Sequence, residues 1–224
     1  MRVELLEHTQ SPEQLVFLAA KLCYSNADID ELLQKVMTEQ ITTFIRKLLK
    51  IGHLSPFEHV SFTFGIEGIS RAASHQLVRH RIASYSQQSQ RYVTYQNLEF
   101  VMPESISSSG LSSKYLKAME YLQGIYHELI VSGIPSEDAR FVLPNACATK
   151  IIVTMNAREL MHFFRLRCCN RAQWEIRDMA VEMLDCVKAV APNIFAKSGP
   201  ACTIGNCPEG EMSCGKPWKR GGDS

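Results

Sequence analysis

The spacing of apolar residues changes along the chain, and this change limits the possible folds more than any other feature. From His59 to Ile69, apolar side chains alternate with small or polar ones, which predicts a half-buried β-strand. Residues 39–50 instead place them three or four positions apart, which predicts an amphipathic helix. Because strands and helices do not alternate regularly, we expect an α+β fold, with helices packed around a small, mostly antiparallel sheet.

Capping and helix-breaking residues place the other elements. Strands are predicted over residues 2–7 and 150–155, and helices are predicted to start at Ser11, at Ser112 or Ser113, at Asn156 and near Ala172. Ser11 with Gln14, like Asn156 with Glu159, has the spacing of a capping box, in which side chains bind free N–H groups of the first turn. We therefore expect side-chain caps at both of these helices. We also expect Ser112 or Ser113 to cap the long helix that starts there.

The C-terminal end of the chain differs from the rest. Helical and strand periodicity stops near residue 197, and glycine, proline and cysteine accumulate after it. We expect a single α+β domain over residues 1–196, which would carry any catalytic site, and a C-terminal tail over 197–224.

Three cysteines of the tail are candidate metal ligands, namely Cys202, Cys207 and Cys214. Their spacing is wider than the tight C-x2-C of zinc knuckles, so we expect no metal site. A zinc site completed by Cys168, Cys169 or another chain stays open as the alternative.

The charge balance excludes several classes of function. The chain has 24 Lys and Arg against 23 Asp and Glu, so its net charge of +1 gives no general attraction to nucleic acids or anionic membranes. Its apolar stretches are far shorter than the roughly 20 residues that span a membrane, and its first residues lack the features of a secretory signal. Eight cysteines in such a chain are typical of reduced thiols. We therefore expect a cytoplasmic protein that binds neither nucleic acid nor membrane.

Residues 71–92 are the segment richest in candidate binding groups. They include four arginines and two histidines but no acid, and hydroxyls and amides fill most other positions. Guanidinium groups bind phosphate oxygens through paired hydrogen bonds, and serine or glutamine can complete the oxygen shell. The composition therefore indicates an anion-binding site. A solvated basic surface is the alternative, although such surfaces usually include acids.

A second basic cluster lies in the helix predicted after the last strand. Arg158, His162 and Arg165 share one face of that helix, and Arg167 and Arg171 follow them. Phenylalanine and leucine occupy the other sides, so we expect a largely buried helix whose arginines need an anionic partner. A surface stripe is the alternative interpretation.

One motif resembles a known family. Arg79-His80-Arg81, then seven residues, then Ser89 and Gln90-Arg91-Tyr92, is similar to the signature of the flavin-dependent thymidylate synthases. The resemblance covers about residues 1–195 and extends to residues 56–59, 139–144, 156–160 and 172–176. It implies that family's fold and a methyltransferase-class enzyme that reductively methylates dUMP to dTMP. It further implies methylenetetrahydrofolate as carbon donor, FAD as cofactor, NADPH as reductant, and a homotetramer whose active sites lie at subunit interfaces.

The resemblance also implies roles for individual residues. Those expected to bind dUMP are Gln76, Arg79, Gln87, Gln88, Ser89, Gln90, Arg91, Arg140 and Arg167. Those expected to bind FAD are Ser55, Arg79, His80, Arg81, Gln87, Asn156, Arg158 and His162, with Glu58 nearby. Arg167 is the expected catalytic residue, because a cation beside the uracil stabilises the base as it loses a ring-nitrogen proton.

Nucleophilic catalysis is not expected. The other type of thymidylate synthase uses a cysteine in a Pro-Cys-His context, and the nearest sequence here is Pro144-Asn145-Ala146-Cys147. The chain also lacks the Gly-x-Ser-x-Gly elbow that would activate Ser89 as in many hydrolases.

Two other functions fit parts of the sequence. A single-stranded RNA-binding module would use the arginines and tyrosines around the first cluster, namely Arg79, Arg81, Arg91, Tyr85, Tyr92 and Tyr95. That hypothesis gives the second cluster no role, and the near-zero net charge predicts weak binding. A structural protein assembled by zinc on the tail cysteines is the third hypothesis, which stoichiometric zinc would favour.

Overall fold

The computed structural model describes residues 1–38, 40–95 and 97–218. A small antiparallel sheet has the strand order β1-β2-β4-β3, with β1 at Arg2–His8, β2 at Ser61–Ser70, β3 at Ala83–Gln87 and β4 at Ala148–Asn156. The helices are α1 (Pro12–Leu22), α2 (Ile29–Thr38), α3 (Ile41–Ile51), α4 (Arg71–Leu77), α5 (Glu104–Ser107), α6 (Ser112–Val131), α7 (Ser136–Ala139), α8 (Ala157–Arg167) and α9 (Trp174–Val190). The expected α+β class is confirmed.

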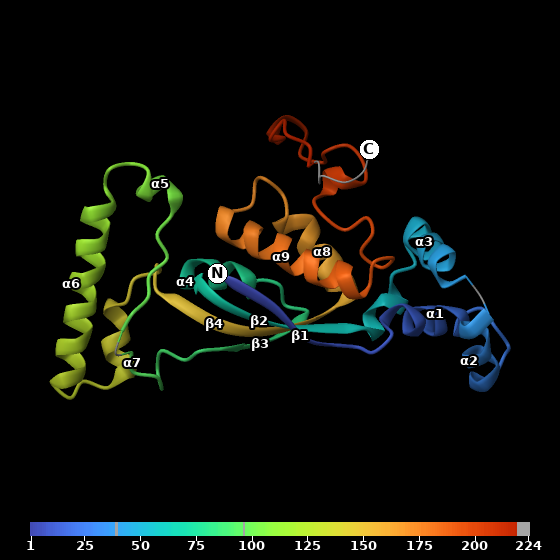
Figure 1. Cartoon of the computed structure of the whole chain (residues 1–224), viewed down its shortest axis with the longest axis horizontal. Helices are drawn as coiled ribbons and strands as arrows, with labels where there is room; N and C mark the ends of the chain where they lie inside the picture. The colour runs from blue at the N-terminus through green and yellow to red at the C-terminus, as the bar shows by residue number, and fades with distance from the viewer. Residues whose placement is uncertain (39, 96, 219–224) are drawn as a thin grey trace. The chain divides into compact units, whose positions relative to one another are not determined.

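The chain divides into two compact units. The first comprises residues 1–2, 66–79 and 85–152, and the second comprises residues 3–65, 80–84 and the chain from 153 onward. In the first unit, α6 packs against α7 (Figure 1), and Tyr126 is buried with Leu98 and Cys147. In the second unit, α1 packs against α2 and α3, and α8 packs against α9 (Figure 1).

Aromatic side chains hold α8 in place within the second unit. The ring of Phe195 meets Phe62 of β2 at a centroid distance of 5.4 Å and Phe164 of α8 at 6.0 Å, both edge to face. All three side chains are fully buried. The helix that carries the second basic cluster is therefore fixed by packing rather than by its charges.

One predicted side-chain cap is confirmed and the others are wrong. Asn156 accepts a hydrogen bond from the Glu159 N–H at 2.8 Å and caps α8. Ser11 makes no such bond, because its φ of 46° is left-handed, whereas a capping side chain needs an extended backbone. Neither Ser112 nor Ser113 caps α6, since Ser112 is already its first helical residue.

Several elements were not expected from the sequence. The helices α2, α5 and α7 have no counterpart among the predictions, and neither does the strand β3. Among the described helices, none combines the length and apolar character that a membrane crossing needs.

Candidate functional site

The N-terminal end of α8 is set by the strand before it. β4 ends at Asn156, and the next N–H, of Ala157, donates to the carbonyl of Val60 at 2.9 Å. This bond and the Asn156 cap fix the direction in which α8 leaves the sheet. The helix then buries Glu159, Leu160 and Phe163 and exposes the opposite face.

The predicted basic strip lies on that exposed face. Arg158, His162 and Arg165 are exposed, so they do share one side of α8, but the expectation of buried arginines is wrong for them and for Arg171. Their guanidinium and imidazole groups reach water because the apolar residues at intervening positions take up the buried side of the helix. Of the basic residues in this second cluster, only Arg167, at the end of α8, is partly buried.

A buried histidine links Arg167 to the interior. His80 is only 6% exposed, and its Nδ1 lies 3.1 Å from Oε1 of Glu159, which is 7% exposed. Arg167 Nε donates to His80 Nε2 at 3.1 Å. Because Nε2 accepts a hydrogen bond, the ring proton lies on Nδ1 and is donated to the Glu159 carboxylate.

Burial keeps the central imidazole neutral. It lowers the pKa of His80, with Glu159 opposing the shift and the charge of Arg167 adding to it. Burial also lowers the pKa of Arg167 from its ordinary value, although a guanidinium stays charged at neutral pH. The three hydrogen-bonded side chains of Glu159, His80 and Arg167 are therefore an anion, a neutral ring and a cation.

His162 completes a cluster with this pair. Its ring lies 5.9 Å from that of His80, and donor atoms of His80, Glu159 and His162 lie within 4.8 Å of one another. Both ring nitrogens of His80 are already engaged, one by Glu159 and one by a cationic guanidinium. The cluster is therefore unsuited to binding a metal ion through His80.

The other residues expected to bind FAD in the second unit lie on its surface. Ser55 and Glu58 belong to the short 3-10 helix Ser55–His59, which packs against α8. The Glu58 carboxylate forms an ion pair with Arg158, and both side chains are about half exposed. Arg81 is also exposed. The surface thus offers cationic and hydroxyl donors to a ligand from solvent.

Most residues expected to bind dUMP lie in the first unit, where two of them form hydrogen bonds with Glu137. Arg91 Nε donates to the Glu137 carboxylate at 2.6 Å, and Arg140 Nε donates to its backbone carbonyl at 3.0 Å. Ser89 Oγ accepts hydrogen bonds from the N–H groups of Arg91 and Tyr92, at 3.1 and 3.4 Å. The Ser89 hydroxyl therefore shapes the loop that brings Arg91 to Glu137.

The glutamines of this segment are held by β4 and α4. Gln87 Nε2 donates to the hydroxyls of Ser74 and Thr149, at 2.9 and 3.2 Å, and the Gln88 N–H donates to the carbonyl of Lys150 at 3.0 Å. Gln76 and Gln90 are half-buried, whereas Arg79 is exposed. Of the residues expected to bind dUMP, Arg167 alone belongs to the second unit, and of those expected to bind FAD, Arg79 and Gln87 belong to the first.

The tyrosines of the first cluster do not form a stacking surface. Tyr85 donates its hydroxyl to the Leu77 carbonyl at 2.9 Å, and the half-buried Tyr95 ring packs against Tyr126. Only Tyr92 of the three is exposed, with the Arg91 guanidinium 5.2 Å from its ring. The arrangement gives the RNA-binding hypothesis no support.

Two acidic residues of these clusters were missed from the sequence. Glu159 was recognised only as a helix-start residue, although its side chain pairs with His80. Glu137 was not predicted as a site residue, since nothing in the sequence relates it to Arg91, which lies 46 positions away. The absence of acids from residues 71–92 was the available signal for Glu137, because paired cations need a carboxylate from elsewhere in the chain.

Comparisons with known proteins find the same family that the sequence motif resembles. A family model described as thymidylate synthase complementing protein matches residues 4–193. A flavin-dependent thymidylate synthase of Geobacter sulfurreducens is 60% identical over 219 residues, covering 96% of this chain and 94% of the relative. Proteins of the same name from Clostridium tetani and Pyrococcus abyssi are 52% and 46% identical, over 96% and 95% of this chain and 94% and 91% of their own lengths.

Proposed function

This chain belongs to the flavin-dependent thymidylate synthase family, and we propose that it converts dUMP to dTMP with FAD as cofactor, NADPH as reductant and methylenetetrahydrofolate as carbon donor. The observation that carries the proposal is the hydrogen-bonded chain Glu159–His80–Arg167. It holds a partly buried cation at the end of α8, where the family resemblance expects the uracil ring.

The residues expected to bind FAD suit that cofactor. Arg81, Arg158 and His162 are exposed, so their N–H groups are open to the pyrophosphate of a dinucleotide. The ion pair with Glu58 limits the directions that the Arg158 side chain can take. When bound, a reduced flavin supplies the hydride that completes the new methyl group.

Arg167 is the proposed catalytic residue. Its Nε is used by His80, which leaves the two terminal nitrogens of the guanidinium to donate to a uracil carbonyl. Negative charge grows on the base when its ring nitrogen loses a proton, and a fixed cation stabilises that charge more than a mobile one would. Because His80 is neutral, it orients the guanidinium without adding a second positive charge.

Arg91, Arg140 and Ser89 are the proposed phosphate ligands. The Glu137 carboxylate is the partner of Arg91 in this structure, and a nucleotide phosphate would offer the guanidinium more oxygens and more negative charge. The Arg91–Glu137 pair is about half exposed on both sides and so contributes little to stability. We therefore expect dUMP to replace Glu137 as the partner of Arg91.

A cysteine nucleophile does not fit the structure. Cys147, the nearest approach to the motif of the other synthase type, is buried, and burial raises its pKa to about 11. Its thiol stays protonated at neutral pH and is a poor nucleophile.

The assembly and location are further parts of the proposal. We propose that residues 1–196 form the catalytic domain, with 197–224 as a tail, and that four chains assemble. Phe141, next to Arg140, is 82% exposed, and Val131 is 87% exposed; a subunit interface would cover such side chains. None of the eight cysteines, all of which the structure describes, forms a disulfide, which supports a cytoplasmic location.

Flavin binding tests the proposal. Protein mixed with FAD and desalted should keep flavin absorbance near ~450 nm, and anaerobic NADPH should bleach it. Arg158→Ala should retain less flavin, whereas Arg46→Ala, which removes an exposed cation from α3, should retain as much as the native chain. Loss of the exposed ion pair costs little stability, so the variant should fold. Protein that keeps no flavin would contradict the proposal.

A further inference from the structure

The tail has a defined path but little core of its own. Between residues 201 and 218 it forms only two short 3-10 turns, Ala201–Thr203 and Gly210–Met212, and most of its side chains are exposed. Segments of this kind usually need a disulfide or a metal to hold them. The cysteines of the chain form no disulfide, so a metal ion is the cross-link to consider.

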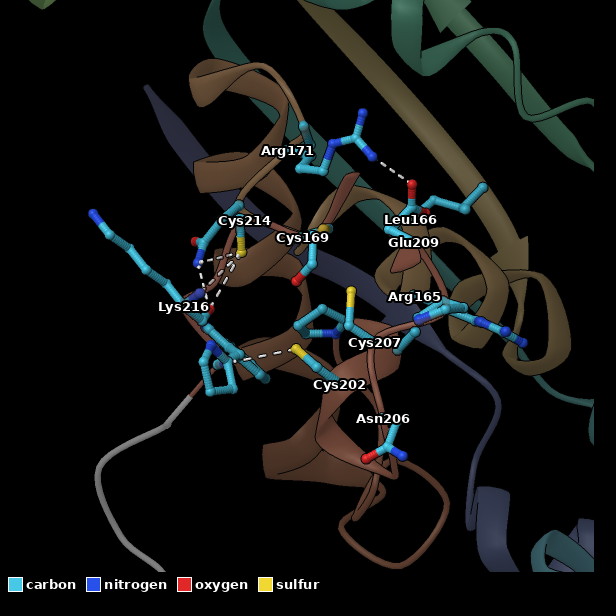
Figure 2. Close-up of a pocket in the computed structure, with 18 of the residues that line it drawn as sticks. Arg165, Leu166, Cys169, Arg171, Cys202, Asn206, Cys207, Glu209, Cys214 and Lys216 are labelled. Atoms are coloured by element: carbon cyan, nitrogen blue, oxygen red, sulfur yellow. Dashed lines mark hydrogen bonds and ion pairs between the residues drawn. The ribbon is translucent and has the colours of Figure 1, made fainter. Parts of the chain in front are cut away.

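Four cysteines line one cavity beneath the tail. The cavity has a volume of about 770 Å³ and lies between the tail and the segment that joins α8 to α9. Its lining includes Cys169, Cys202, Cys207 and Cys214, and Figure 2 shows these residues around the same hollow. Cys168, the neighbour of Cys169, is fully buried and does not line the cavity.

Backbone and side-chain N–H groups point at two of the sulfur atoms. The N–H of Lys216 donates to Cys214 Sγ and that of Trp218 to Cys202 Sγ, each at 3.4 Å, and Asn170 Nδ2 lies 3.9 Å from Cys214 Sγ (Figure 2). The Cys214 thiol also donates to the carbonyl of Lys216 at 3.4 Å, a bond that metal binding would replace. The N–H donors would then stabilise and orient the thiolate, as the outer partners of metal ligands do.

The charges around the cavity favour an anionic centre. Arg165, Arg171 and Lys216 line it, and Glu209, the only acid among the described lining residues, pairs with Arg171 at 2.5 Å. A zinc ion with four thiolates carries a net charge of −2, which nearby cations would offset.

We propose that Cys169, Cys202, Cys207 and Cys214 bind one Zn²⁺ ion as a structural site. Four thiolates are the soft ligand set that selects zinc, and four protein ligands leave no open position for catalysis. Binding releases the thiol protons to solvent, because the thiolate is the ligand. This inference replaces the expectation from spacing that the chain binds no metal.

The site closes as the metal binds. Among the described residues, the only group with donor atoms gathered within 4.8 Å is the His80 cluster, so the four thiols line the cavity without yet meeting at coordination distance. Zinc–sulfur bonds of about 2.3 Å would draw the turns of the tail together. Because Arg165 and Arg167 line the same cavity, the metal would also tie the tail to the end of α8.

Metal analysis of the full-length protein tests the site. Protein purified without chelator should contain about one zinc per chain, and a mercurial thiol reagent should release it. Cys207→Ser and Cys214→Ser should lose most of this zinc, whereas Cys23→Ser, which changes an exposed cysteine far from the tail in sequence, should keep it. When the zinc of the native protein is replaced by Co²⁺, the absorption spectrum should show sulfur-to-cobalt charge-transfer bands. This measurement uses no variant, so it does not depend on how the variants fold.

Three results would overturn the proposal. One is native protein without zinc after growth in zinc-replete medium, and another is iron with visible cluster absorbance in its place. The third is zinc that survives Cys207→Ser but is lost in His162→Ala, because the metal would then lie at the His80 cluster. The zinc content does not depend on flavin, so failure here would leave the proposed enzymatic function untouched.

Discussion

Replacing Arg167 with alanine is expected to lower kcat for dTMP formation by about 10²–10³-fold, the usual effect of removing one preorganised donor to a developing negative charge. The guanidinium is partly buried and held by His80 at 3.1 Å, so water cannot supply an equally oriented charge. The effect should fall on kcat more than on KM, because the charge on the base grows only as the reaction proceeds.

Arg167→Lys should recover only part of this loss. Lysine keeps the charge but lacks the planar fork that can bond His80 and the uracil at the same time. Steady-state kinetics of Arg167→Ala, Arg167→Lys and the control Arg46→Ala would measure the effect. If Arg167→Ala kept more than half of the native kcat, Arg167 would not be the catalytic residue.

Replacing Glu159 with alanine is expected to destabilise the protein by about 1–3 kcal/mol, since it removes the carboxylate that accepts the hydrogen bond from the buried His80 N–H. Turnover should fall as well, because His80 would no longer hold Arg167 in one orientation. Glu159 acts through His80 and is thus a positioning residue. Glu159→Gln keeps an acceptor and should restore most of the stability measured by urea unfolding.

The pH dependence of stability separates positioning from simple packing. Because the folded-state pKa of His80 is lowered, the unfolded chain binds protons more readily, and the free energy of unfolding should fall as the pH drops below about 6.5. Glu159→Gln removes the charge that opposes this shift, so its stability should continue to fall to lower pH than that of the native chain. Identical pH profiles for both proteins would show that the carboxylate charge has no role.

Local patterns in the sequence predicted the elements that carry the site. The alternation of Phe62, Phe64 and Ile66 gave β2, and the spacing from Asn156 to Glu159 gave the start and cap of α8, since both depend on residues close in the chain. β3 was missed because Ala-Ser-Tyr-Ser-Gln has only two apolar residues, Ala83 and Tyr85, too few to establish an alternation. The segment becomes a strand through pairing with β4.

Contacts between residues far apart in the sequence could not be predicted from local patterns. Glu159 and His80 are 79 positions apart, and neither residue signals the other in the sequence. The Ser11 cap failed for a different reason, because the left-handed backbone at this residue depends on how α1 meets the preceding strand rather than on its side chain. The grouping of Cys169 with the tail cysteines likewise depends on the path of the tail over α8.

The folate product of a single turnover tests the central claim most directly. Protein loaded with FAD and reduced anaerobically would be mixed with dUMP and methylenetetrahydrofolate, and the nucleotide and folate products would be separated and counted. The account predicts dTMP and tetrahydrofolate in equal amounts, with one reduced flavin oxidised per dTMP. Dihydrofolate as the product would contradict it, because the folate and not the flavin would then have supplied the hydride.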